Sequence, residues 1–373
     1  MIDRVEYPYW IALGGMSGIF TRRKNEIIIR CCYELGHPLS ALFRATSAEK
    51  FSVYNLNETE QALFHRAMDD ISKFSYMAED LLEQGFGIIP VFDRGNYPNE
   101  LKRNLGKNSP VVLYYKGDVS ILNQECVAIV GSRKASQKSL DFTDSVAKLA
   151  VEQNRPTVSG YAAGIDRQAL DSAIKYGGKS IVVLPQGILT FGTGFRSLYR
   201  EIITGNVIVT SAFYPTAPWS RELAMARNPI IYALAKEIFV AESSDRGGTF
   251  SGVENGLKKK RTIFVRNPES NENNANNLLI QMGCVPVNSE GVVLSVFRDE
   301  TKCSMSEDDV IKEKIVVLLK QGKYNSKDIV NHLRINWTSN KVSRVIMTIP
   351  NVNKSKIKGL TYYSILLPEP RLL

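Results

Sequence analysis

The sequence has little of the chemistry on which metalloenzymes, secreted proteins and membrane proteins depend. Its three histidines, His37, His65 and His332, lie far apart, so we expect no metal site. The five cysteines form no Cys-x-x-Cys pair, which favours a reducing compartment. The longest apolar runs, such as 230–235, are far shorter than the roughly 20 residues that span a bilayer, and the N-terminal MIDRVEYPYW lacks the pattern of a secretory signal. We therefore expect a cytoplasmic protein with no membrane partner.

A surplus of positive charge is present, and it lies near the carboxyl terminus. The 373-residue chain has a net charge of +9, and residues 310–373 alone hold twelve Lys and Arg against three Asp and Glu. This distribution indicates a basic appendage on an electrically balanced body. A solvated lysine-rich tail is the alternative to a nucleic-acid-binding module.

The middle of the chain alternates short apolar segments with helical patterns. Six such segments occur, at 126–130, 156–159, 180–185, 207–212, 237–242 and 261–265. Apolar strands that alternate with helices predict a mostly parallel sheet covered on both faces, which is a doubly wound α/β fold. Two further strands are expected before them, at 87–92 and 110–115.

The two ends of the chain differ from this core. Apolar residues at helical spacing over 26–35, 58–74 and 75–82 predict a helical N-terminal domain over 1–84, which leaves 85–303 for the core. Three helical stripes followed by two short strands predict a basic winged-helix domain over 304–373.

The predicted winged-helix domain should present its third helix to a nucleic-acid groove. Ser326 is expected to cap the second helix, and Thr338 or Ser339 the third. The third helix then turns Lys341 and Arg344 outward. A basic protein-interaction module is the alternative for this segment.

Glycine-rich turns follow three of the predicted strands, at 131–136, 159–166 and 243–252. In a doubly wound sheet, ligands bind outside the carboxyl ends of the strands, so these turns are expected to outline one groove. In the first turn, Gly131 would let a ligand approach the backbone, and the amides that follow would point out of a helix N-terminus. Arg133 and Lys134 add positive charge, which suits a phosphate group.

The predicted groove lacks the signatures of common cofactor and catalytic sites. Its first turn has no Gly-x-Gly-x-x-Gly for a dinucleotide, and Ala173 stands where a P-loop ending at Ser180 needs glycine. No histidine lies near the turns in sequence, and no Gly-x-Ser-x-Gly motif occurs. We therefore expect no cofactor, no catalytic residue and no enzymatic activity.

Seven motifs occur in a fixed order along the core. They are a strand followed by Asn-Tyr-Pro and Leu (88–101), PVVLYYKGD (110–118), VAIVGSRKAS (127–136), SGYAAGID (159–166), GGKSIVVLPQGI (177–188), ARNPII (226–231) and IFVAESS (238–244). Over roughly residues 80–285, this series resembles the DNA-processing protein A (DprA/Smf) family. The resemblance implies a Rossmann-like core, and a SAM-like helical domain before it and a winged helix after it are compatible with that family.

Several departures mark the chain as a divergent member of this family. Leu170 stands where a histidine usually follows SG-x-A-x-GID, and Ser211-Ala212 replaces the usual Ser-Glu after the fourth strand. Segment 191–195 replaces the expected Tyr-Pro, and the usual RNRII is Arg-Asn-Pro-Ile-Ile at 227–231.

The resemblance implies that the protein binds single-stranded DNA and loads RecA recombinase onto it, usually as a homodimer. The apolar segment 278–282 is the predicted dimer interface, with a core helix as the alternative. Contact of the winged helix with double-stranded DNA is a further expectation. Whether the role is transformation, repair or phage defence stays open.

Aromatic residues in the loops are candidates for stacking on bases, namely Tyr161, Phe191 and Phe195. Ordinary loop packing is the alternative for each, as a structural ion pair is for Arg227 and local hydrogen bonding for Asn228. The candidate DNA-binding residues are Gly131, Ser132, Arg133, Lys134, Ser136, Ser159, Gly160, Tyr161, Gly164, Asp166, Phe195, Arg196, Arg227, Asn228, Gly248, Thr249, Lys341 and Arg344.

Two other classes of function stay open from the sequence. One is an enzyme or sensor for a small nucleotide, because Glu242 beside Gly247-Gly248-Thr249 is reminiscent of related Rossmann-like folds that bind nucleotides or cleave N-glycosides. The other is a DNA-binding regulator that uses mainly the winged helix, in a mobile-element or phage-defence setting. Affinity that rises with oligonucleotide length favours a DNA binder, whereas saturable binding of a mononucleotide favours the enzyme or sensor.

Overall fold

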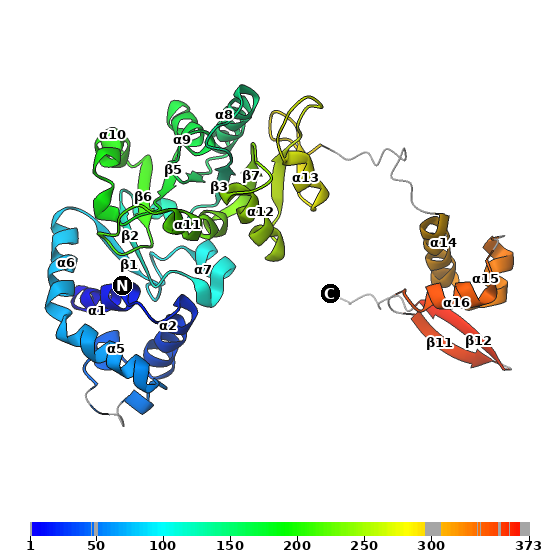
Figure 1. Ribbon diagram of the computed structural model, residues 1–373, viewed down its shortest axis with the longest axis horizontal. Helices are drawn as coiled ribbons and strands as arrows, with labels where there is room; N and C mark the ends of the chain where they lie inside the picture. The colour runs from blue at the N-terminus through cyan, green and yellow to red at the C-terminus, as the bar shows by residue number, and fades with distance from the viewer. Residues whose placement is uncertain are drawn as a thin grey trace. The chain divides into compact units, whose positions relative to one another are not determined.

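The computed structural model describes residues 2–45, 47, 51–294, 307–333, 335, 337–349, 352–357 and 359–365. The chain divides into two compact units, Met1–Leu294 and Ser295–Leu373 (Figure 1). The first unit contains both the predicted helical domain and most of the predicted core, and their separation at residue 84 stays a prediction. The predicted boundary at residue 303 lies outside the described residues.

In the described part of the first unit, nine strands form one sheet in the order β1-β2-β6-β5-β4-β3-β7-β8-β9. The strands are β1 (Gly87–Pro90), β2 (Val112–Lys116), β3 (Cys126–Val130), β4 (Thr157–Ser159), β5 (Ser180–Val183), β6 (Val207–Ser211), β7 (Ala235–Val240), β8 (Ile263–Arg266) and β9 (Val285–Val287). Strands β3 to β9 run parallel to one another, whereas β2 pairs antiparallel with β6, and the edge strand β1 pairs antiparallel with β2. The predicted mostly parallel α/β sheet is confirmed, and β9 is a strand beyond those expected.

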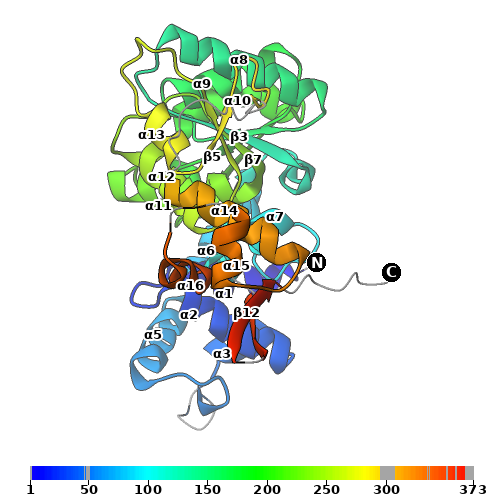
Figure 2. The same ribbon diagram turned by 90° about the vertical axis from the view of Figure 1, so that its right-hand side faces the viewer.

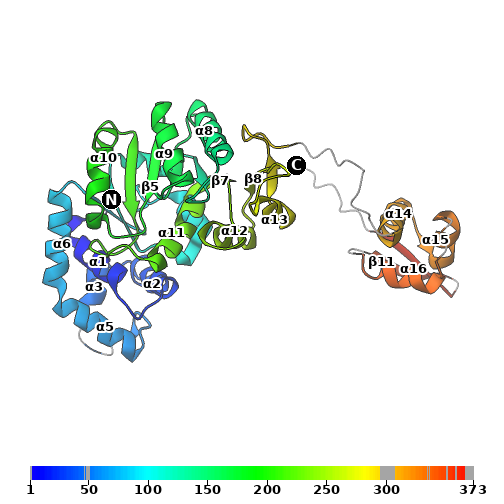
Figure 3. The ribbon, with the colours of Figure 1, turned by 45° about the horizontal axis from the view of Figure 1, so that its top comes forward.

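Helices cover both faces of the sheet because its central strands are apolar on both sides. Along β3, Val127 and Ile129 pack under α8 (Gln137–Glu152) and α9 (Ile165–Lys175). Ala128 and Val130 belong instead to the core beneath α11 (Arg221–Leu234). This two-residue alternation is that of a strand buried on both faces. Figure 3 shows α8 and α9 on one side, and α11 with α12 (Gly248–Lys258) on the other. The remaining helices of this region are α7 (Asn99–Leu105), α10 (Gly192–Ile203) and α13 (Asn276–Gln281).

The helices before the sheet gather at one end of the first unit (Figure 2). They are α1 (Tyr7–Gly15), α2 (Thr21–Ile28), the π-helix η2 (Ile29–Glu34), α3 (Leu39–Phe43), α5 (Glu58–Asp69) and α6 (Ile71–Glu83). Trp10, Ile11 and Leu13 of α1 are buried, and this helix packs on α6 and on strands β1 and β2. The sequence predicts a helical break after residue 74. The structure places it at Asp70, because this residue leaves helical geometry and ends α5.

The second unit contains α14 (Glu307–Gln321), β10 (Tyr324–Asn325), α15 (Ser326–Leu333), α16 (Ser339–Ile346), β11 (Val352–Ile357) and β12 (Leu360–Ile365). Its three strands form a small sheet in the order β10-β12-β11. A core of its own holds the unit together, built on Ile315, Ile329, Val342 and Ile346.

Two helix caps of the second unit can be compared with the prediction. The Thr338 hydroxyl accepts a hydrogen bond from the Lys341 amide and caps α16, as predicted. The start of α15 differs, because the Asn325 side chain accepts the amides there while the Ser326 hydroxyl hydrogen-bonds to the Ser343 hydroxyl at 2.6 Å. In the portions of the chain that the structure describes, no helix combines the length and the apolar character needed to cross a membrane.

Candidate nucleic-acid interface

The strand order reverses between β3 and β7, and a cavity of about 550 Å³ lies outside the carboxyl ends of these two strands. From β3 the sheet continues through β4, β5 and β6 on one side, and through β7, β8 and β9 on the other. Such a reversal leaves a crevice that is the usual ligand site of a doubly wound sheet. All three predicted glycine-rich turns and one side of α11 line this cavity. We call it the groove.

Gly131 and Gly164 are needed because the chain packs closely on itself beside the groove. A Cβ at Gly131 would lie 2.6 Å from Cγ1 of Ile165 and 3.0 Å from the Glu242 carbonyl oxygen. Gly164 has a φ of +80°, and a Cβ there would lie 2.3 Å from the Ser132 carbonyl oxygen. The direction of a Cβ at Gly131 is thus filled by the start of α9, whereas Gly131 itself lines the groove, so a ligand contact with its backbone stays a prediction.

The N-terminus of α8 is occupied by the chain's own carboxylate, that of Glu242. Its Oε2 accepts hydrogen bonds from the Ser136 amide at 3.0 Å, the Ser136 hydroxyl at 2.6 Å and the Ser139 hydroxyl at 2.8 Å. A carboxylate in this position satisfies helix donors and interacts favourably with the helix dipole. The Ser136 amide is thus engaged by the chain's own carboxylate, whereas phosphate binding by the other amides of this turn and a DNA contact at Ser136 stay predictions.

Asp166 and Arg227 form a buried ion pair beneath the groove. Arg227 is 4% exposed, donates to the Val183 carbonyl at 2.8 Å and lies 3.9 Å from Oδ2 of Asp166. Burial raises the pKa of Asp166, while Arg227 and the Gly160 amide oppose the rise. A Cβ at Gly160 would lie 1.5 Å from the guanidinium, so only glycine fits there. These three residues shape the floor of the groove, and their direct contact with DNA stays a prediction.

Exposed arginines supply the positive charge of the groove. Arg133 is exposed on the first turn, and in the described part of the chain no carboxylate lies within ion-pair distance of it. Arg133 and Asp166 both line the groove, and the positive charge of Arg133 partly offsets the rise in the pKa of Asp166 that burial causes. Arg246 lines the groove beside Asp245 at 3.4 Å, but both side chains are exposed, so the pair is weak.

The predicted stacking residues contact one another through their ring edges. The ring centroids of Tyr161 and Phe191 are 4.9 Å apart, and those of Phe191 and Phe195 are 5.2 Å apart. Phe191 is only 9% exposed, so the stacking prediction is wrong for this residue because protein covers its ring. Phe195 is half-buried.

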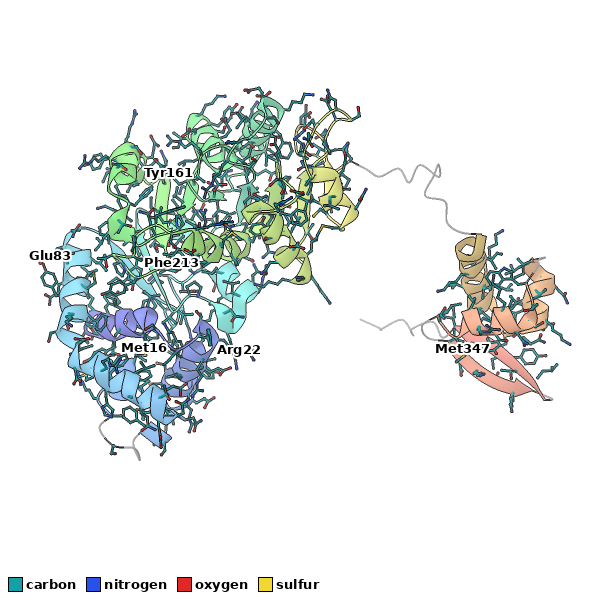
Figure 4. The ribbon with its side chains drawn as sticks, viewed as in Figure 1. Met16, Arg22, Glu83, Tyr161, Phe213 and Met347 are labelled. Carbon is teal, nitrogen blue, oxygen red and sulfur yellow. The ribbon has the colours of Figure 1, made fainter. Side chains whose placement is uncertain are left out.

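Tyr161, labelled in Figure 4, differs from the two phenylalanines in its backbone conformation and in the polar contacts of its ring. Its φ of +62° is uncommon for a residue with a side chain. Its hydroxyl hydrogen-bonds to the Ser197 hydroxyl at 2.8 Å, and the Arg167 guanidinium lies 5.1 Å from the ring centroid. The ring is thereby fixed beside the second turn, half-buried.

The remaining candidates either brace the turns or lie outside the groove. Thr249 donates to the Gly131 carbonyl at 3.1 Å, and Asn228 donates to the Gly248 carbonyl at 3.3 Å, so both hold the third turn in place. Ser132 also lines the groove, whereas the buried Ser159 hydroxyl donates to the backbone of α9. Lys134 and Arg196 are exposed outside the groove lining, and Lys341 and Arg344 belong to α16 of the second unit.

Several groove residues are absent from the predicted set, among them Trp219 and Arg221 at the start of α11. Trp219 is 52% exposed, and Ser220 caps the helix by accepting the Leu223 amide at 3.1 Å. Ser220 followed by Arg221 and Glu222 is a sequence pattern that predicts the start of a helix. No pattern in the sequence connects this start to the glycine-rich turns.

A metal site needs several ligating side chains close together. Within the described ranges, no three His, Cys, Asp or Glu side chains are grouped so that they could hold a metal ion.

Comparison with known proteins gives a consistent set of relatives. Residues 88–298 match the sequence model of the family described as DNA recombination-mediator protein A. DNA processing protein DprA of Streptococcus pneumoniae is 32% identical over 158 residues, which are 42% of this chain and 56% of that protein. Protein Smf of Synechocystis sp. is 23% identical over 300 residues, which are 78% of this chain and 72% of that protein.

The fold agrees with a solved structure of one of these relatives. The X-ray structure of S. pneumoniae DprA superposes with a TM-score of 0.61 at 25% identity, covering 78% of this chain and 96% of that chain. The sequence match to that protein spans little more than half of its length. Because the family match covers more than half of the chain and the solved relative shares its fold, the protein belongs to the DNA recombination-mediator protein A family.

Proposed function

We propose that the protein is a recombination mediator that binds single-stranded DNA in the groove between β3 and β7. Family membership supports a role on DNA, and the groove supports the site. The observation that carries the proposal is Arg133, an exposed guanidinium at the groove with no carboxylate partner in the described residues. A guanidinium can hold a phosphate through two parallel hydrogen bonds.

Base contacts would come from aromatic rings near the phosphate contacts. Tyr161 is fixed by Ser197 and Arg167 in the second turn, outside the groove lining, and Trp219 is exposed in the groove lining just before α11. Stacking on such rings tolerates any base. Sequence-tolerant binding of single strands follows from this combination.

We propose that the protein acts on DNA without catalysis. An enzyme that cleaves an N-glycoside would need a carboxylate aimed at its substrate, and Glu242 is the candidate in the third turn. Its Oε2 instead accepts three hydrogen bonds from Ser136 and Ser139 at the start of α8. This engagement favours a structural role for Glu242 over the nucleotide enzyme or sensor.

Loading of RecA and homodimer formation are further parts of the proposal. The family description, recombination mediator, supports a recombinase as partner. For the dimer, the support comes from α13 and its C-cap, where the apolar side chains of Leu278 and Met282 are 42% and 37% exposed. A second copy of the chain would cover these side chains.

The second unit would add a contact with double-stranded DNA. Its order of helix, strand, two helices and hairpin supports the winged-helix assignment, in which α16 enters a groove of the duplex. Arg344 is exposed on α16, and the Lys341 ammonium lies 4.2 Å from the Trp337 ring centroid. This placement favours contact with a phosphate backbone.

A length series tests the proposed function against its main alternative. Affinity for oligothymidylates of increasing length is measured by fluorescence anisotropy with the full chain, and dAMP is the mononucleotide comparison. Single-strand binding predicts affinity that rises with length and little competition by dAMP. Saturation of the groove by dAMP, with no gain from longer strands, would support a nucleotide sensor and contradict the proposal.

A further inference from the structure

A second cavity, of about 590 Å³, lies between the N-terminal helices and α11. It is separate from the groove because α11 stands between them. Leu223, Ala226 and Pro229 line the second cavity, whereas Arg227 and Asn228 line the groove. Both cavities lie within the first unit. A volume of this size holds a small organic ligand.

The charged group of this cavity is a buried lysine without a counter-ion. Lys24 of α2 is 6% exposed, and its ammonium donates to the Gly14 carbonyl at 2.9 Å. In the described residues it forms no ion pair, and no Asp or Glu lines the cavity. Burial lowers the pKa of Lys24 to about 8, which reflects the cost of keeping the charge there. Lysine is almost never this buried unless it is paired, which points to an anion as the missing partner of Lys24.

The walls of the second cavity are aromatic and aliphatic. Tyr114, Phe213 and Tyr214 line it together with Val112 and the apolar side of α11 (Phe213 is labelled in Figure 4). The Tyr214 ring is held against α1, since a Cβ at Gly15 would lie 2.8 Å from its Cδ2. These surfaces suit a flat apolar body whose anionic group reaches Lys24.

Lys259 gives the second cavity another positive charge. This exposed lysine follows α12 and lines the cavity, whereas its exposed neighbour Lys258 does not. The lining therefore combines two cations with aromatic walls and lacks a carboxylate in the described part of the chain.

We infer that the second cavity is a ligand site for a small aromatic anion, a flat ring system that carries one phosphate or carboxylate group. A nucleoside monophosphate and an aromatic carboxylic acid share this chemistry. The site is distinct from the groove, and it does not depend on the binding of single-stranded DNA there.

Isothermal titration of the full chain with dAMP, with 1-naphthoate and with inorganic phosphate tests this inference. Lys24→Met keeps the length of the side chain and removes its charge, Ala226→Phe fills the cavity without changing charge, and Lys258→Met is the matched control. We expect an aromatic anion to bind saturably to the wild type and to Lys258→Met, and at least tenfold more weakly to the other two variants. Lys24→Met should melt no lower than the wild type, because it removes an unpaired buried charge.

The three probes distinguish the sources of the ligand. Binding of dAMP alone assigns the site to nucleotides, and binding of 1-naphthoate alone assigns it to aromatic acids. Should Lys24→Met fail to fold, Ala226→Phe carries the same comparison. The inference is overturned if neither aromatic anion binds, if inorganic phosphate binds as tightly as they do, or if binding persists unchanged in the variants that fold.

Discussion

The carboxylate of Glu242, which follows β7, lies 2.6 Å from the hydroxyl of Ser136, which precedes α8, and accepts a hydrogen bond from it. The chain thus places its own anion at the helix N-terminus that borders the groove. In the proposed groove, a phosphate would therefore be held by side chains such as Arg133 rather than by the Ser136 amide. The hydrogen bond between Ser136 and Glu242 serves the fold, whereas the exposed side chain of Arg133 is the group proposed to contact DNA.

Replacing Glu242 by glutamine is expected to lower stability and to improve DNA binding. The variant loses charge-assisted hydrogen bonds and a favourable interaction with the helix dipole, which together contribute about 1–2 kcal/mol to the free energy of unfolding. It also removes a negative charge beside the groove, so affinity for single strands should rise. Urea unfolding and anisotropy measure the two effects. The control Glu152→Gln, at the exposed far end of α8, should change neither, and equal behaviour of the two variants would contradict the assigned role.

Acid should remove the stabilisation that Glu272 provides. Glu272 pairs with the buried Arg266, and this pairing lowers its pKa from 4.5 to about 2. Because the folded state favours the ionised form, the contribution is complete above pH 4.5 and is lost as the pH falls toward 2. Glu272→Gln should therefore destabilise the protein at pH 7 by about 2 kcal/mol, and less at lower pH. Unfolding curves between pH 2 and 7 test this, and a difference that stays constant with pH would refute it.

Tyr161 and Phe191 should respond differently to alanine substitution although their rings touch. Tyr161→Ala is expected to weaken single-strand binding by about 1–3 kcal/mol and to leave folding intact, and Tyr161→Phe should retain most of the affinity. Phe191→Ala should instead cost about 3–5 kcal/mol of stability, since it empties a buried position. Affinity and thermal unfolding are measured on each variant. Loss of affinity in a Phe191→Ala protein of wild-type stability would show that the ring reaches DNA.

Removal of residues 306–373 should flatten the salt dependence of DNA binding. This segment holds twelve Lys and Arg against six Asp and Glu, and it belongs to the second compact unit. Each phosphate that it neutralises contributes about 0.7–0.9 to the slope of log K against log salt. Titrations between 50 and 300 mM salt compare the full and shortened chains. An unchanged slope would exclude the second unit from the DNA contact.

The core of the fold could be predicted because its pattern is local. Short apolar runs such as 126–130 and 180–185, set between helical patterns, favour buried strands, and both runs form strands close to the expected limits. The break at Asp70 could not be predicted, because it depends on the backbone geometry of that one residue. The use of Asn325 rather than Ser326 as the cap of α15 could not be predicted either, because the Ser326 hydroxyl hydrogen-bonds to the distant Ser343 hydroxyl.

The position of the groove could be predicted from the sequence, but most of its side-chain contacts could not. Parallel strands bring their carboxyl ends to one edge, which is why turns from distant parts of the sequence meet there. Which side chain faces which is set by tertiary packing. Ile165 fills the space beside Gly131, and Glu242 takes the helix N-terminus, and neither contact has a signal in the sequence.

DNA binding in the groove is expected to depend most directly on Arg133. Because charge-assisted hydrogen bonds contribute about 1.5–3 kcal/mol, Arg133→Ala should weaken binding of an oligothymidylate by roughly 10–150-fold, and Arg133→Lys should recover only part of the loss. Thermal unfolding on the same preparations should match the wild type, since the side chain is exposed, and Arg200→Ala on α10 should bind normally. An Arg133→Ala protein that melts like the wild type and binds single strands equally well would contradict the proposed DNA groove.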